Sequence, residues 1–216
     1  YTLAVDGANV FSWGYFTIEI NEVAIAANGK CTAAEALSFL NGKAVVSSST
    51  LGLANEFGTS IDCTGSTDFD GPQAYYSFNA QAGKFYDFAI TPTFSGRAYI
   101  FPDSAGCSSG STPNINAACG SEGDTGTYTT SNISANATEQ FVFKPTTAGK
   151  YVVVIDSTAP TIYGDFAMTV EEKDAPTNDT CAAATPLSFT AGKATATGTN
   201  KGAANEHGTS IDCTGS

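Results

Sequence analysis

The stretch KFYDFAI, residues 84–90, decides the fold class, because large apolar side chains recur in it at every second position. Successive side chains of a β-strand point to opposite faces, so Tyr86, Phe88 and Ile90 share one face of an extended chain, whereas Phe85 lies on the other. Similar alternation, or a short apolar run, predicts further strands at 74–79, 97–101, 139–145, 150–156 and 165–171. The run at 150–156 is apolar enough to be a central strand.

A second pattern recurs at a spacing of 150 residues. ANEFGTSIDCTGS (54–66) returns as ANEHGTSIDCTGS (204–216). Residues 1–23 also align with 151–173, and Tyr1, Asp6, Gly14 and Phe16 recur 150 residues later. The spacing predicts a tandem array of domains. In this interpretation the chain is a window of the array and holds three parts: the end of one repeat (1–23), a complete repeat (24–173), and a linker with the start of the next (174–216).

The turn-forming residues between the predicted strands complete the prediction of the fold. Turn signals such as Asp70-Gly71-Pro72 and Ser95-Gly96 separate the apolar runs. Only 31–40 could be helical, and its counterpart 150 residues later carries Pro186 in mid-run, which disfavours a helix. About eight short strands in one repeat therefore predict an all-β, antiparallel, jelly-roll-like β-sandwich.

Composition and charge exclude several classes of function. The formal net charge is −12, which repels phosphate backbones and anionic lipid surfaces, so we expect no nucleic-acid partner. No apolar run approaches the roughly 20 residues of a membrane helix, so we expect no membrane insertion in this window. The single histidine, His207, is replaced by Phe57 in the complete repeat, which removes histidine-based triads. We therefore expect no enzymatic activity and no cofactor.

The six cysteines indicate disulfides and a secreted protein, because their number is even and no CxxC motif occurs. Four cysteines in one repeat allow three connectivities. The last fragment carries only the first two of the four, so local pairing is the simplest scheme. It predicts the bridges Cys31–Cys63, Cys107–Cys119 and Cys181–Cys213.

Three longer stretches resemble a known family of secreted bacterial domains. They are NDTCAAATPLSFTAGKATATGT (178–199), DFDGPQAYYSFNAQAGKFYDFAITP (68–92) and FKPTTAGKYVVVIDS (143–157) with the later GDFAMTV (164–170). They are similar to pre-peptidase C-terminal (PPC)-like domains, as is the pair of cysteines at 107 and 119. The resemblance implies a disulfide-stapled jelly-roll module, attached to secreted proteases or repeated in large surface proteins. One branch of the family, in collagenases, binds collagen. Because the domains here are in tandem, the repetitive surface proteins are the closer analogue; the chain resembles in this respect the giant filament proteins of gliding bacteria, including grappling-hook appendages.

Two motifs could bind a cation or carry a glycan. Asp68 and Asp70 in STDFDGP could offer oxygens to Ca²⁺, although an Asx-turn leading into the next strand explains the same residues. DSA and DST resemble a bacterial O-glycosylation pattern, which predicts Ser104 and Ser157 as acceptors; plain turns explain them equally.

The most similar stretch, 54–66, has two interpretations. A fixed local shape around Cys63 would preserve it. Alternatively, it is a contact that every repeat presents to its neighbours. The candidates for such a contact are Asn55, Glu56, Ile61 and Asp62.

These features predict a structural repeat of an extracellular filament, stalk or adhesin at a cell surface. Its partners would be other copies of the repeat or chain, with a host or prey surface as a further target. Two alternatives remain: a glycan- or protein-binding module acting by avidity, and an accessory domain of a secreted hydrolase.

Overall fold

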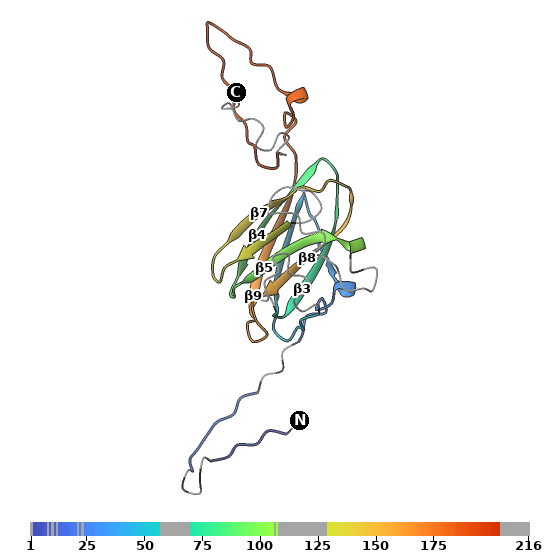
Figure 1. Ribbon diagram of the computed structural model, residues 1–216. Coiled ribbons are helices and arrows are strands. Elements are labelled where there is room, and N and C mark those ends of the chain that lie inside the picture. The colour runs from blue at the N-terminus through green and yellow to red at the C-terminus, as the bar shows by residue number, and fades with distance from the viewer. Residues whose placement is uncertain are drawn as a thin grey trace, which may run out of the picture.

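Nine strands form two packed sheets in the computed structural model, which describes residues 2–7, 9, 11, 13–20, 22, 24–56, 70–105, 107 and 129–203 (Figure 1). The five-stranded sheet has the order β1 (Glu35–Ala36), β3 (Gln73–Ala80), β8 (Gly149–Ser157), β5 (Gly96–Pro102) and β6 (Thr129–Ile133). The four-stranded sheet has the order β2 (Lys43–Ser49), β9 (Asp165–Asp174), β4 (Lys84–Pro92) and β7 (Glu139–Phe143). The described residues also form three short 3-10 turns: η1 (Cys31–Ala33), η3 (Asp103–Ala105) and η6 (Cys181–Ala183).

The main core lies between the two sheets and is rich in aromatic rings. The predicted face of β4 points into it, because Tyr86, Phe88 and Ile90 are completely buried. Phe78 of β3 packs across the sandwich on Tyr86, with ring centroids 4.8 Å apart. Aromatic pairs at such distances contribute about 0.5–1.5 kcal/mol beyond simple burial. Period-two alternation thus places one apolar row of each sheet against the other.

Strand β8 is buried on both faces, as its apolar run predicts. Val153 and Ile155 belong to the main core, whereas Val152 and Val154 belong to a second cluster on the outer face of the five-stranded sheet. The second cluster also contains Cys31, Tyr75, Tyr99, Phe101 and Cys107. This sheet therefore has a covered outer face.

The predicted antiparallel β-sandwich is confirmed, with differences in detail. Every strand pair is antiparallel except β1 with β3. Strands β1, β2 and β6 lie outside the predicted ones. The stretch 31–40 is not helical beyond the single turn η1, since β1 follows it directly. No helix among the described residues is long and apolar enough to span a membrane.

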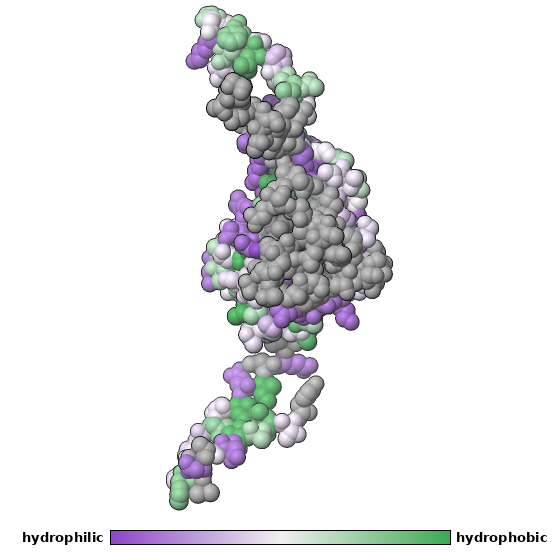
Figure 2. Space-filling view, in the orientation of Figure 1, coloured by the Kyte–Doolittle hydropathy of each residue, from purple (hydrophilic) through white to green (hydrophobic). Residues whose placement is uncertain are grey.

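The two ends of the chain leave the sandwich in opposite directions (Figure 1). The segment before the sandwich exposes a row of apolar residues, which Figure 2 shows as a green stretch. They are Leu3, Val5, Phe16, Ile18 and Ile20, exposed by 46–78%. The residues 150 positions later are Val153, Ile155, Phe166, Met168 and Val170, all of them buried in the main core.

The segment after the sandwich repeats backbone features found 150 residues earlier. The turn η6 corresponds to η1, and a backbone pair joins Thr190 to Lys193 as another joins Leu40 to Lys43. The positive φ angles recur as well, at Gly42 (76°) and Gly192 (79°) and at Gly52 (78°) and Gly202 (75°). Glycine tolerates this region best, so the same backbone turns follow from the same residues.

Candidate functional site

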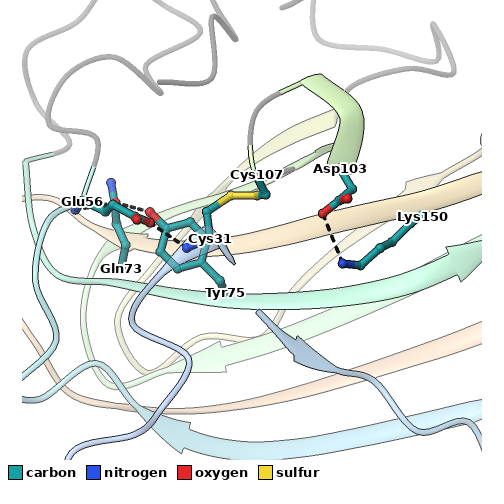
Figure 3. The surroundings of a disulfide bond; sticks show 7 residues. All are labelled: Cys31, Glu56, Gln73, Tyr75, Asp103, Cys107 and Lys150. Carbon is teal, nitrogen blue, oxygen red and sulfur yellow. Dashed lines mark hydrogen bonds and ion pairs between the residues drawn. A yellow bond between two sulfur atoms is a disulfide. The ribbon is translucent and has the colours of Figure 1, made fainter. Parts of the chain in front are cut away.

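A disulfide joins Cys31 in η1 to Cys107 just after η3, with the two Cα atoms 5.0 Å apart (Figure 3). The predicted pairs Cys31–Cys63 and Cys107–Cys119 are therefore wrong. Both bonded cysteines are buried with Tyr75, Tyr99 and Phe101 on the outer face of the five-stranded sheet, so neighbours in space, not in sequence, determine the pairing. Cys63, Cys119 and Cys213 lie outside the described residues, so the predicted Cys181–Cys213 bridge stays a prediction.

Beside the disulfide, a chain of hydrogen bonds crosses the buried outer face (Figure 3). The Tyr75 hydroxyl donates to Gln73 Oε1 at 2.5 Å, and Gln73 Nε2 donates to Asp156 Oδ2 at 3.1 Å. Burial raises the pKa of Tyr75 far above its usual range, and the carboxylates of Glu56 and Asp156 raise it further. The phenol therefore stays protonated and acts as a hydrogen-bond donor at any physiological pH.

A buried positive charge lies beside this cluster, on the neighbouring strand β5. Arg97 of β5, only 7% exposed, lies directly opposite Asp156 of β8 in the sheet register. Its Nε and Nη2 donate to Asn132 Oδ1 at 3.0 and 2.8 Å. A buried charge requires such partners, because removing it from water without them is costly. These side-chain hydrogen bonds join β3 to β8 and β5 to β6, an arrangement that orders the fold.

Asn55 and Glu56, the second and third residues of the repeated stretch, make contacts within the domain. The Asn55 amide donates to the carboxylate of Asp70. The Glu56 carboxylate accepts from the backbone N–H of Cys31 at 2.6 Å, and the Glu56 N–H donates to Gln73 Oε1 at 3.1 Å. Both side chains hold the loop ends against η1 and β3, which supports the interpretation of a fixed local shape. Ile61 and Asp62 lie outside the described residues.

The cation and glycan candidates are only partly described. Asp68 lies outside the described residues, and Asp70 is the acceptor for Asn55. No cluster of three or more metal-ligating side chains occurs in the described part of the chain. Ser104 is exposed in η3, so its glycosylation stays a prediction. The prediction for Ser157 conflicts with the fold, because its side chain is completely buried and its hydroxyl donates to the Pro72 carbonyl at 3.4 Å.

The outer face of the four-stranded sheet carries a pocket of about 550 Å³. Hydroxyl side chains line most of it, because the serines at the end of β2 lie beside β9 and β4. Its lining residues are Ser47, Ser48, Ser49, Thr91, Thr93, Asp165, Phe166 and Ala167. Hydroxyls and one carboxylate can bind a polar ligand by hydrogen bonds. The sequence contains a signal for this pocket in the run of serines at 47–49, but the run has no distinctive spacing.

Comparison with known proteins yields distant likenesses of fold. No protein-family model matches the chain, and no curated protein matches its sequence significantly. Periplasmic inhibitors of g-type lysozyme, PliG, from Aeromonas hydrophila and Salmonella Typhimurium are 13% and 12% identical, with TM-scores of 0.35 and 0.32. These alignments cover 65% and 64% of this chain and 96% of each inhibitor.

The collagenase of Bacillus anthracis supplies a further similar structure, its pre-peptidase C-terminal domain. That domain is 16% identical, with a TM-score of 0.30, and the alignment covers 71% of this chain and all of the domain. Identities and scores of this size do not assign the chain to a family.

Proposed function

We propose that this chain is a stretch of an extracellular structural array, in which β-sandwich repeats of 150 residues follow one another and residues 24–173 form one complete repeat. One observation carries the proposal. The apolar residues exposed in segment 1–20 stand 150 positions before residues that are buried in β8 and β9. The segment thus has the pattern of two core strands but none of the sheet that would cover them.

Four further features support the proposal. The backbone turns after the sandwich repeat those at its beginning, at the same spacing of 150 residues. The chain also enters and leaves the sandwich at opposite ends, the geometry required for domains joined end to end (Figure 1). The buried disulfide favours an oxidising, extracytoplasmic compartment. Side-chain hydrogen bonds on the outer face join neighbouring strands, as expected of a module whose task is structural.

This function is tested by a completion experiment, in which the missing first part of a repeat is added in front of segment 1–23. In an extended protein, residues 24–150 precede Tyr1 of the full chain, so that segment 1–23 can act as the last two strands of a new domain. We expect amide hydrogen exchange in 2–20 to slow to the rates of β8 and β9. The same protein with Val5→Asp is the control, because Val5 corresponds to the buried Ile155. Equal, fast exchange in both proteins would contradict the array.

The hydroxyl-lined pocket favours a second candidate function, binding of a polar ligand such as a glycan. Isothermal titration of the chain with a panel of oligosaccharides tests it. Ala167→Trp fills the pocket and should abolish binding, whereas Val45→Trp, at an exposed position on β2 outside the pocket lining, should leave it unchanged. Absence of binding to every sugar, or equal loss in both variants, would reject this function.

A further inference from the structure

Phe85 is buried on the side of β4 that faces away from the core. Its neighbours Tyr86 and Phe88 point into the sandwich, and Phe85 belongs to neither apolar cluster. It is nevertheless only 4% exposed. The segment after the sandwich covers it: a Cβ added to Gly202 would lie 2.3 Å from the Phe85 ring. Phe85 also lines a pocket of about 450 Å³ between the sheet and this segment. Its other lining residues include Thr197, Gly198, Thr199 and Lys201, and Asp174, Pro176, Thr177 and Asn178 of the linker.

A row of alternating charges leads from the sheet to this segment. Asp87 of β4 and Glu171 of β9 lie directly opposite each other, an arrangement that like charges disfavour. Lys173 Nζ bridges them, at 3.3 Å from Asp87 Oδ2 and 2.7 Å from Glu171 Oε2. Lys43 pairs with Glu171 from the β2 side at 3.3 Å. At the other end, Lys201 Nζ lies 2.5 Å from Asp87 Oδ2.

A second ion pair holds the linker itself. Lys144, just after β7, contacts Asp179 at 2.5 Å, and both side chains are largely buried, with exposures of 19% and 13%. Buried pairs are screened less by salt than exposed ones. The linker is therefore held on the β7 side by Lys144, while the turn that follows it is held on β4 by Phe85 and Asp87.

We propose that Phe85, Asp87 and Lys144 form a docking joint for the following repeat of the same chain, and that this joint fixes the angle between successive repeats. The inference rests on the proposed function, since it takes 174–203 as the start of that repeat. Gly202 has the glycine Gly52 as its counterpart in the complete repeat, and an added Cβ would lie 3.0 Å from the Ile25 side chain there, so both glycines permit a close approach to an apolar side chain. Lys201 has Leu51 as its counterpart, so the ion pair is specific to this junction.

Nuclear magnetic resonance of the full chain tests the contact directly. The Gly202 position faces the Phe85 ring, so one Gly202 Hα resonance should be shifted upfield by the ring current and should return to its ordinary position in Phe85→Leu. Gly192, whose φ of 79° matches the 75° of Gly202, has open space around it and should show neither effect. An unshifted Gly202 resonance would overturn the joint.

Amide exchange over 197–203 measures the strength of the docking with matched variants. Lys201→Glu should speed exchange about two- to fivefold, the range for a partly exposed ion pair. Gly202→Ala should speed it about tenfold or more, because the ring would lose its cover. Lys193→Glu and Gly192→Ala make the same chemical changes in the same segment, at exposed positions, and should have no effect. Equal effects in both members of either pair would overturn the proposal.

The two proposals fail in different ways. The completion experiment concerns residues 1–23 and can fail while the Gly202 resonance remains shifted, which would leave a segment docked on β4 without an array. Successful completion together with an unshifted resonance would leave the array with freely hinged repeats and would reject the joint alone.

Discussion

Reduction of the Cys31–Cys107 bridge should lengthen the chain under tension by an amount that identifies the pairing. The bridge spans 76 residues of sequence. At about 3.3–3.6 Å per residue, these residues contribute roughly 250–270 Å of contour length. When the chain is held by its two ends and pulled in an atomic force microscope, the unfolding step of the sandwich should be shorter by this amount in the oxidised protein.

The value does not depend on whether Cys63 and Cys119 also form a bridge. The shortest path from position 31 to position 119 then still runs through Cys107, so the same 76 residues are withheld. Local pairing, Cys31–Cys63 with Cys107–Cys119, would withhold spans of only 32 and 12 residues, or about 150 Å in total. A difference near 150 Å would therefore refute the described connectivity.

The same perturbation gives a thermodynamic check. In the chain-entropy account, closing a loop of this length stabilises the folded state by about 4.5 kcal/mol. The double variant Cys31→Ser, Cys107→Ser should show this loss in urea unfolding at equilibrium, and a loss below about 1 kcal/mol would contradict the reasoning.

Three further perturbations have defined outcomes. Phe88→Ala should lower the free energy of unfolding by about 3–5 kcal/mol, whereas Phe85→Ala, outside both cores, should lower it by less than about 2 kcal/mol; urea titrations compare them, and equal losses would contradict the assignment. Glu56→Ala removes the acceptor for an N–H in η1 and should cost about 1–2 kcal/mol, and an unchanged urea midpoint would refute this. Hydrogen bonding to Lys173 lowers the pKa of Glu171 from its ordinary 4.5, so its stabilising contribution is present above that pH and disappears as the pH falls through the lowered value. The melting-temperature difference between the wild type and Glu171→Gln should accordingly vanish in acid, and a constant difference would contradict this.

Strands whose faces differ in polarity could be predicted from the sequence. Tyr86, Phe88 and Ile90 identified β4 because one face is apolar, and 150–156 was recognised as central because it is apolar on both. Strand β2 gives no such signal, because its three apolar residues, 44–46, do not alternate and the serines Ser47–Ser49 that follow are typical of loops as well. Alternation of apolar and polar residues reveals a strand only when the two faces of that strand differ in polarity. It fails for strands at the edge of a sheet whose residues alternate only weakly.

The disulfide and the joint depend on contacts that local sequence does not encode. Cys31 and Cys107 meet because η1 and η3 both lie over the outer face of one sheet, a consequence of strand order. Phe85 did carry a signal, an aromatic residue on the otherwise polar face of β4. The sequence could not show that residues more than 100 positions later cover it.

The stretch of lowest similarity between the two copies runs over 45–51 and 195–201, where no residue is shared. Four of the residues that line the pocket beside Phe85 fall within it: Thr197, Gly198, Thr199 and Lys201. In the proposed array, divergence between repeats is therefore concentrated where each repeat touches the one before it. Repeats of one shape could then be connected at different angles, so that the residues at the junctions between repeats would determine the curvature of a long fibre.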